Sequence, residues 1–202
     1  MDEIYDRLSL PIVSAMLTDV HARMMVRELV NALSVGVDGD VVEFGCNMGT
    51  ASVFLQKVLL EMGGGRKLWC YDSFKGLPLR GLEDENWFKI GNMASSRKQF
   101  EAVFARVGLS LPEVKEGWFK DLSATDLPRR ICFAYLDCDL YASMKEAMAL
   151  VISRLALGGK MLIHDTKAPG VRKAMAECVP DGFFVMEWNN PTIYGFMCLR
   201  RM

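Results

Sequence analysis

Apolar residues repeat every three or four positions in five segments of the chain, and each repeat predicts an amphipathic helix with one buried face. Short apolar runs between these segments fit buried strands of a parallel sheet. The helices are expected at residues 11–34, as one or two helices, and at 51–62, 95–107, 144–155 and 171–178. The strands are expected at residues 41–44, 67–73, 113–118, 131–136 and 160–163.

The alternation of strands and helices predicts an α/β fold, with a doubly wound, mostly parallel, Rossmann-like sheet. Residues 183–188 and 193–199 flank Asn189-Asn190-Pro191-Thr192, so they predict a C-terminal antiparallel hairpin. Residues 77–94 show no clear period and are expected to form a lid loop. We expect one domain over residues 1–202, with N-terminal helices within residues 1–37.

Composition narrows the classes of partner. With 24 Lys plus Arg against 25 Asp plus Glu, the net charge of -1 provides no field that would recruit nucleic acid or an anionic membrane. The charged first thirty residues do not resemble a signal peptide, and no apolar run is long enough to span a bilayer, so a cytoplasmic protein is expected. The six cysteines have no CxxC spacing and are expected to be reduced and mostly buried. A homo-oligomer remains an open alternative.

A glycine turn follows the first expected strand, where open parallel sheets bind their ligands. Gly45 and Gly49 allow a close backbone approach, but the middle glycine of the dinucleotide motif GxGxxG is missing, which favours S-adenosylmethionine (SAM) over NAD. Asp72 lies 23 residues after Gly49 and is expected to accept hydrogen bonds from ribose hydroxyls, and Glu43 to orient the methionine end. The alternative for Asp72 is a solvated strand-end acid.

A second group of polar residues follows the last two buried strands. Asp137 and Asp139 come directly after residues 131–136, and His164 and Asp165 come after residues 160–163. If these strand ends are neighbours, three or four side chains converge where a divalent cation could bind. The alternatives are that Asp137 or Asp139 caps the following helix, and that His164 is a structural histidine.

Four motifs within residues 36–180 resemble those of the macrocin O-methyltransferase family, which methylates sugar hydroxyls with SAM and a divalent metal, usually magnesium. The resemblance implies that Asp137 and Asp165 bind the metal, that Asp139 is the base and that Asp72 binds the ribose. The family tends to have paired aspartates at the position of His164-Asp165, and an imidazole ligand suits Mn, Fe or Zn better than Mg. The motifs are Gly39-Asp40-Val41-Val42-Glu43-Phe44-Gly45, Asp72-Ser73-Phe74-Lys75-Gly76-Leu77-Pro78, Glu116-Gly117-Trp118-Phe119-Lys120-Asp121 and Asp137-Cys138-Asp139-Leu140-Tyr141.

The predicted function is metal-assisted O-methylation of a hydroxyl on a small molecule such as a sugar or a natural-product intermediate. The alternatives are a metal-independent N- or O-methyltransferase with His164 as base, an NAD-dependent oxidoreductase, and a SAM-binding protein without catalysis. Asp139 and His164 are the expected catalytic residues, and Asp137, His164 and Asp165 the expected metal ligands. The expected cofactor-binding residues are Glu43, Gly45, Gly49, Thr50, Ser52, Asp72, Ser73, Gly117, Trp118 and Asp137.

Overall fold

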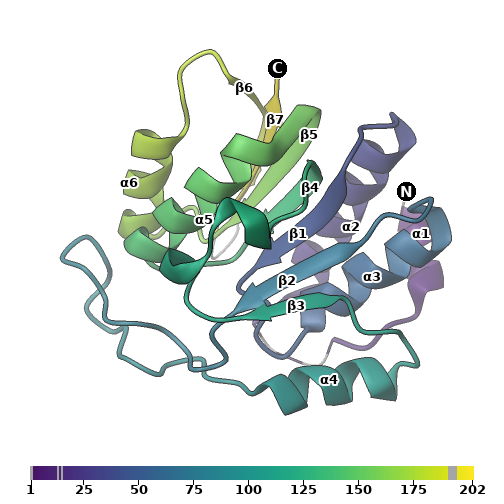
Figure 1. Ribbon diagram of the computed structural model, residues 1–202, viewed down its shortest axis with the longest axis horizontal. Coiled ribbons are helices and arrows are strands. Elements are labelled where there is room, and N and C mark those ends of the chain that lie inside the picture. Colours follow the sequence, from purple (N-terminus) through teal and green to yellow (C-terminus); the bar gives the residue numbers. More distant parts are fainter. Residues whose placement is uncertain (1, 13, 15, 191–194) are drawn as a thin grey trace.

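One seven-stranded sheet organises the protein, in the order β3-β2-β1-β4-β5-β7-β6 (Figure 1). The computed structural model describes residues 2–12, 14, 16–190 and 195–202. The strands are β1 (Asp40–Phe44), β2 (Leu68–Asp72), β3 (Glu113–Glu116), β4 (Ile131–Leu136), β5 (Leu155–His164), β6 (Phe184–Asn190) and β7 (Phe196–Arg201). All neighbours pair in parallel except β7, which is antiparallel to both β5 and β6. This is the expected doubly wound sheet with a closing antiparallel hairpin.

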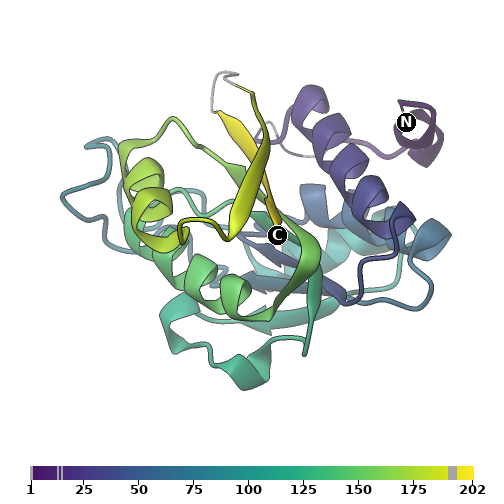
Figure 2. The ribbon, with the colours of Figure 1, turned by 90° about the horizontal axis from the view of Figure 1, so that it is seen from above.

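Helices cover both faces of the sheet. The helices are α1 (Asp2–Leu8), α2 (Asp19–Ser34), α3 (Thr50–Met62), α4 (Arg97–Arg106), α5 (Tyr141–Arg154) and α6 (Pro169–Cys178), with two short 3-10 turns at Phe119–Asp121 and Ala124–Asp126. Seen from above, α1 to α3 lie on one side and α5 and α6 on the other (Figure 2). The sheet has one hydrophobic core on each face. Within β4, Phe133 and Tyr135 belong to the core that includes residues of α1 to α4, whereas Ala134 and Leu136 belong to the core that includes residues of α5 and α6. Burial on both faces explains the unbroken apolar run of this strand.

The register of the strands decides which residues meet at the edge of the sheet. The last paired positions across β2, β1, β4 and β5 are Tyr71, Phe44, Leu136 and Ile163. The residues that follow them are Asp72, Gly45, Asp137 and His164, which therefore form one row along the carboxyl edge. The row includes the junction of β1 and β4, where the strand order reverses and ligands bind in such sheets.

The N-terminal prediction was wrong for residues 11–18. Helix α2 begins only at Asp19, and the described residues of 11–18 are not helical, while α1 lies earlier in the chain than expected. Thr18 has an extended backbone and its side chain accepts a hydrogen bond from the His21 N–H, so it caps the helix. The helical spacing of apolar residues continues on both sides of Thr18, so the spacing alone provides no sign that the helix begins there.

Two boundaries near the C-terminus also differ from the expected ones. β5 begins at Leu155, so the Gly158-Gly159 pair lies inside the strand and not before it. Gly158 has a φ of 77°, and the pairing with β4 shifts between Ile131 and Phe133, so the strand tolerates the glycines as an irregularity. In the hairpin, Asn189 and Asn190 were expected in the turn but belong to β6, whereas the expected turn residues Pro191 and Thr192 and the expected strand residues Ile193 and Tyr194 lie outside the described residues.

Three further expectations concern the remaining segments. Residues 77–94 contain neither helix nor strand, as expected. All six cysteines are free thiols, and all but Cys178 are buried. Across the part of the chain that the structure describes, no helix has the length and apolar character needed to cross a membrane.

Candidate active site

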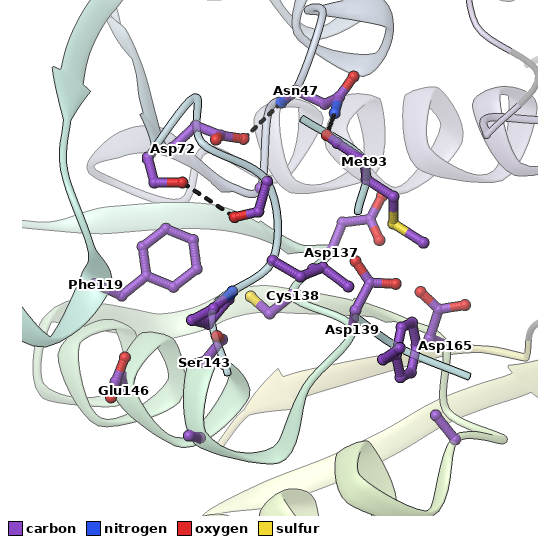
Figure 3. Close-up of a pocket in the computed structure, with 18 of the residues that line it drawn as sticks. Asn47, Asp72, Met93, Phe119, Asp137, Cys138, Asp139, Ser143, Glu146 and Asp165 are labelled. Atoms are coloured by element: carbon purple, nitrogen blue, oxygen red, sulfur yellow. Dashed lines mark hydrogen bonds between the residues drawn. The ribbon is translucent and has the colours of Figure 1, made fainter. Parts of the chain in front are cut away.

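A pocket of about 650 Å³ opens at the carboxyl ends of β1, β2, β4 and β5 (Figure 3). It brings together nine of the residues singled out from the sequence: Gly45, Asp72, Ser73, Gly117, Trp118, Asp137, Asp139, His164 and Asp165. The pocket also has lining residues that the sequence did not single out, among them Asn47, Met93, Ser143 and Glu146. Glu43, Gly49, Thr50 and Ser52 lie behind the glycine turn and do not line this pocket.

Asp72 is held at the end of β2 by backbone donors. Its two carboxylate oxygens accept hydrogen bonds from the Asn47 N–H and the Phe74 N–H, each at 2.7 Å. Each oxygen keeps a lone pair for a further donor. Burial raises the pKa of Asp72 above its ordinary value, although the backbone donors oppose that shift. Asp72 is therefore a positioned acceptor and not a solvated strand-end acid.

Asn47 connects the glycine turn to the end of the loop of residues 77–94, called the long loop below. Its side chain donates to the Met93 carbonyl at 2.6 Å (Figure 3), and its backbone has a φ of 45°. The left-handed conformation is unusual for residues other than glycine, but Asn tolerates it better than most. Its place inside the glycine turn was the one signal in the sequence that could have identified it.

The two glycines of the turn are required by close contacts. A Cβ on Gly45 would overlap the backbone carbonyl oxygen of Asp137, because the β1 and β4 ends approach each other there. Gly49 begins the turn into α3 with a φ of 86°, and a Cβ on it would lie 2.9 Å from the Phe100 ring. Gly45 therefore brings its backbone to the pocket, whereas Gly49 serves the packing of α3 against α4.

Glu43 lies in the interior behind the turn. The Ser52 hydroxyl donates to its Oε2 at 2.5 Å, while its Oε1 and the Thr50 hydroxyl have no hydrogen-bond partner within the described residues. Both residues line a small cavity of about 30 Å³ that Gly45 and Asp137 also border. Unpartnered buried polar atoms are costly, so a polar group in this cavity would find unused hydrogen-bond partners there.

Burial raises the pKa of Glu43 to about 8, with a smaller opposing effect from the Ser52 hydroxyl. The pKa of this carboxyl in the unfolded chain is about 4.5, so between pH 4.5 and pH 8 the folded protein keeps Glu43 protonated while the unfolded chain does not. The contribution of Glu43 to the free energy of unfolding is therefore fully present below pH 4.5, and about 3 to 5 kcal/mol of it is lost as the pH rises through 8.

We expect Glu43→Gln to remove most of that dependence, because the neutral amide mimics the protonated acid. The free energy of unfolding of both proteins, measured by chemical denaturation from pH 5 to 8, should therefore converge at pH 5 and diverge toward pH 8. Parallel curves for the two proteins would show that Glu43 ionises normally in the folded state.

Asp137, Asp139 and Asp165 lie around the buried His164 imidazole, and these four residues are called the acidic cluster below. Its Nδ1 lies 3.1 Å from Asp137 Oδ1 and 2.9 Å from Asp165 Oδ2. Its Nε2 lies 3.1 Å from Nδ1 of His21, a buried residue of α2. One ligand atom from each of Asp137, His164 and Asp165 lies within 4.8 Å of the others, so these three side chains could hold a metal ion. His21 was not expected in this cluster, because nothing in the sequence links α2 to the end of β5.

Burial and neighbouring charges shift the pKa values of the residues in this cluster in different directions. Burial alone would lower the pKa of His164, but the carboxylates of Asp137 and Asp165 raise it well above its ordinary value. Burial raises the pKa of Asp137, and the His164 charge more than offsets this, so the net pKa lies below its usual range. Burial and the charges of Asp137 and Asp165 raise the pKa of Asp139 well above its ordinary value. Asp139 is therefore the carboxyl group in this cluster that most readily takes a proton.

Strained backbone accompanies the cluster. Asp139 and Asp165 have φ values of 55° and 56°, in the left-handed region. Such conformations cost roughly 1 to 3 kcal/mol each and persist where the surrounding structure enforces them, often at functional sites. Figure 3 shows both residues at the pocket, on the same side as Asp137. The two left-handed turns thus bring the side chains of Asp139 and Asp165 to the wall of the pocket.

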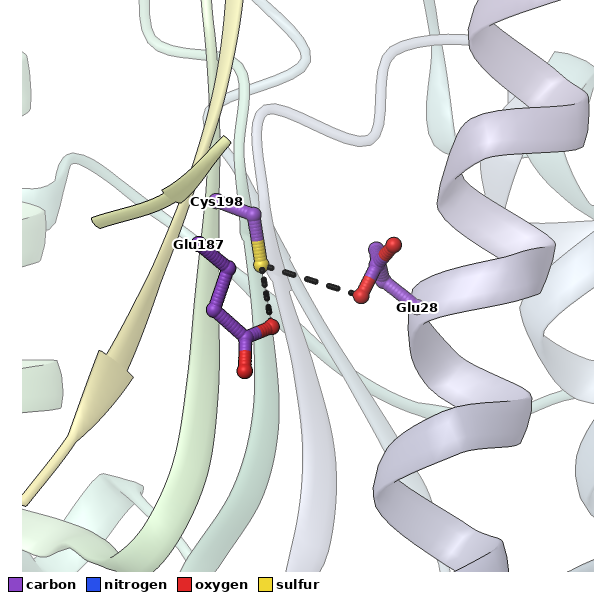
Figure 4. Close-up of side chains that lie close together, drawn as sticks. All are labelled: Glu28, Glu187 and Cys198. Carbon is purple, nitrogen blue, oxygen red and sulfur yellow. Dashed lines mark hydrogen bonds between the residues drawn. The ribbon is translucent and has the colours of Figure 1, made fainter. Parts of the chain in front are cut away.

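Another group of acidic and thiol side chains lies away from the pocket, where Glu28, Glu187 and Cys198 approach each other (Figure 4). Here the Lys160 ammonium already donates to Glu28 Oε2 and to Glu187 Oε2, each at 2.6 Å. The Trp188 indole N–H donates to the other oxygen of Glu28. Arg27 forms a further ion pair with Glu28, and Arg200 with Glu187, so the two carboxylates are fully offset and the network ties α2 to the C-terminal strands.

The long loop forms the wall opposite the sheet. Phe88 is buried against Leu77 and Leu140, while Trp87 is 58% exposed at the mouth of the pocket. The indole N–H of Trp87 donates to Glu85 Oε2 at 2.7 Å. Phe88 thus has a packing role, and Trp87 is the aromatic side chain that remains available at the entrance.

Comparison with known proteins identifies a family for this chain. The family model of macrocin O-methyltransferases matches residues 11–179. A tetracenomycin-type rhamnosyl 4'-O-methyltransferase of Streptomyces olivaceus is 34% identical over 153 residues, which are 71% of this chain and 59% of the relative. The mycinamicin III 3''-O-methyltransferase of Micromonospora griseorubida is 30% identical over 73% of this chain and 63% of its own. The chain thus spans about three fifths of the length of these curated relatives.

Solved structures share the fold. The O-methyltransferase NovP superposes with a TM-score of 0.77 at 20% identity, covering 90% of this chain and 79% of NovP. The calicheamicin methyltransferase CalS11 superposes with a TM-score of 0.72 at 17% identity, covering 98% of this chain and 90% of CalS11. At these identities the likeness concerns the fold alone.

Proposed function

This chain belongs to the macrocin O-methyltransferase family, and we propose that it transfers the methyl group of SAM to a hydroxyl of a small molecule, such as a sugar or a natural-product intermediate. The observation that carries the proposal is the row of strand-end residues. It joins a positioned hydrogen-bond acceptor, Asp72, and a buried acidic cluster within one pocket of about 650 Å³. The acceptor is a small molecule, and no nucleic-acid or membrane partner is invoked.

The pocket and the small cavity behind the glycine turn would together contact the methyl donor in three places. Asp72 would accept the ribose hydroxyls, with Ser73 and Gly117 beside it. Trp118 and Phe119 offer aromatic faces for the adenine. The unpartnered oxygens of Glu43 and Thr50 would meet the polar methionine end, and the turn from Gly45 to Gly49 leaves its backbone accessible there. Ser52 acts by orienting Glu43.

The acidic cluster fits a divalent cation by its donor set. Two carboxylates and an imidazole converge, and a protonated His164 offsets only one of the two carboxylate charges, which leaves the set suited to a cation. With Nδ1 on a metal, the Nε2–H of His164 would donate to His21, which is the kind of outer partner that orients ligating histidines. We propose Asp137, His164 and Asp165 as the ligands of Mg, Mn or a similar ion. When bound, the ion would orient the acceptor hydroxyl and lower its pKa.

Asp139 would remove the acceptor proton. As the methyl carbon bonds to the acceptor oxygen, its bond to sulfur breaks and sulfur keeps the electron pair, giving S-adenosylhomocysteine. The hydroxyl proton passes to the carboxylate of Asp139, which lines the pocket two residues after the proposed metal ligand Asp137. In the metal-independent alternative, His164 would take that proton instead.

We expect SAM to bind the purified protein, and Asp72→Ala to weaken the binding by about 10- to 150-fold, because the ribose loses a charged acceptor worth roughly 1.5 to 3 kcal/mol. Calorimetric titration with SAM measures both affinities. Glu116→Ala is the matched control, since Glu116 pairs with Asp72 across the sheet but is exposed and outside the pocket. An equal affinity in wild type and Asp72→Ala would remove Asp72 from the site.

Turnover is tested by the formation of S-adenosylhomocysteine from SAM with glycosides that carry free sugar hydroxyls. Methyl transfer to an oxygen of one of them supports the proposal. Tight SAM binding with no product from any acceptor would favour a SAM-binding protein without catalysis.

A further inference from the structure

Asp84 in the long loop is buried, although nothing in the proposed chemistry uses it. Its Oδ2 accepts the Gly81 N–H within the loop, and its Oδ1 accepts the Tyr141 N–H, both at 2.7 Å. Tyr141 is the first residue of α5. A carboxylate from far upstream in the chain therefore caps this helix.

Neither of the two helices near Asp84 has a cap of its own. The residues that precede them, Leu140 for α5 and Ala168 for α6, provide no side-chain capping bond. Gly170, in the first turn of α6, packs so closely on the Asp84 carboxylate that a Cβ there would overlap Oδ1. The positive ends of both helix dipoles thus lie around one negative side chain.

The segments that lead into these two helices carry the acidic cluster. Asp139 lies two residues before Tyr141, and Asp165 lies four residues before the start of α6. Both have the left-handed backbone described above, which needs support from neighbouring structure. On the loop side, Leu77 and Phe88 pack on Leu140 and add an apolar contact to the hydrogen bond.

We propose that Asp84 is a positioning residue that holds Asp139, and through α6 also Asp165, in the orientation needed at the acidic cluster. It touches neither substrate nor metal in this assignment and acts through the backbone of the two turns. The catalytic part of this inference rests on the proposed methyl transfer, whereas the positioning part concerns the backbone alone.

The test compares Asp84→Ala and Asp84→Asn with Glu83→Gln in the full chain. Glu83 forms an exposed ion pair with Lys173 of α6 at 3.0 Å, so its substitution removes a neighbouring charge without removing a cap. Hydrogen exchange is measured at the amides of Tyr141 and its neighbours. We expect exchange to accelerate by about 5- to 30-fold in Asp84→Ala, less in Asp84→Asn, which keeps one acceptor oxygen, and not at all in Glu83→Gln.

The same proteins are assayed for turnover per folded molecule well below their melting temperatures, and for SAM affinity. Asp84→Ala should lower the turnover number on the order of 10- to 100-fold, as expected for misplaced catalytic groups, with the SAM dissociation constant near the wild-type value. A purely stabilising residue would lower the melting temperature and leave the turnover number unchanged, which would overturn the proposal.

Unchanged exchange at Tyr141 in both Asp84 variants would also overturn it, whatever the activity. If wild type transfers no methyl group to any acceptor, the proposed function fails, while exchange still decides whether Asp84 holds the turn. If Asp84→Ala does not fold, Asp84→Asn provides the same comparison with a smaller expected effect.

Discussion

Replacing Asp139 by Asn is expected to lower the turnover number by about 10²- to 10⁴-fold, the usual contribution of a positioned base. The amide keeps the shape of the side chain but cannot accept the proton. Because Asp139 lies outside the set of three candidate ligands, SAM affinity and metal content should stay close to wild type. Steady-state kinetics, calorimetry with SAM and metal analysis of the same preparation provide the three measurements.

Two alternatives for Asp139 give different results in the same variant. If Asp139 were a helix cap, Asn would replace it with little loss, and in the structure the first N–H of α5 is bonded to Asp84. If Asp139 were a metal ligand, metal content would fall together with turnover. Wild-type turnover in a folded, metal-loaded Asp139→Asn protein would exclude Asp139 as the base. The variant His164→Ala would then be assayed to test His164 in that role.

Removing divalent cations is expected to reduce turnover by about 10²-fold or more, since a bound cation typically contributes several kcal/mol to the stabilisation of charge. The experiment treats the protein with EDTA, removes the chelator and measures turnover before and after adding back Mg or Mn. Restoration by the metal supports the proposed ligand set. Full turnover after exhaustive chelation would contradict it and favour the metal-independent mechanism.

His164→Asp distinguishes the ligand from the base within that experiment. If His164 binds the metal, the substitution should shift the metal preference toward Mg, because a carboxylate is a harder ligand than an imidazole. The variant should then remain active with Mg. If His164 is the base of a metal-independent enzyme, the variant should lose activity under all metal conditions.

The sheet and the main site residues were predictable from local patterns. The unbroken apolar run of β4 and the glycine turn after β1 identified the central strands, and acids at strand ends converge wherever those strands are parallel neighbours. Their spatial row therefore followed from the strand order. The expectation for residues 11–18 was wrong because the apolar spacing does not reveal an N-cap that precedes a helix of similar period.

Contacts between distant segments were not predictable in the same way. The imidazole of His21 meets His164 although 143 positions separate them, and Asp84 caps a helix that begins 57 positions later. Such partners are set by tertiary packing, and a lone histidine or aspartate carries no local sign of it. The unpartnered oxygens of Glu43 and Thr50 likewise depend on how the turn folds over β1.

The different construction of the two walls of the pocket has a consequence for the effect of substitutions there. The wall that is proposed to face SAM consists of the residues at the strand ends. The position of its backbone is fixed by the register of the sheet. The facing wall is a loop without helix or strand, and beyond Asp84 it presents the exposed Trp87 to the pocket. If the protein acts as proposed, substitutions at Glu85 and Trp87 would change the surface offered to the acceptor and leave the strand ends that face the donor unchanged.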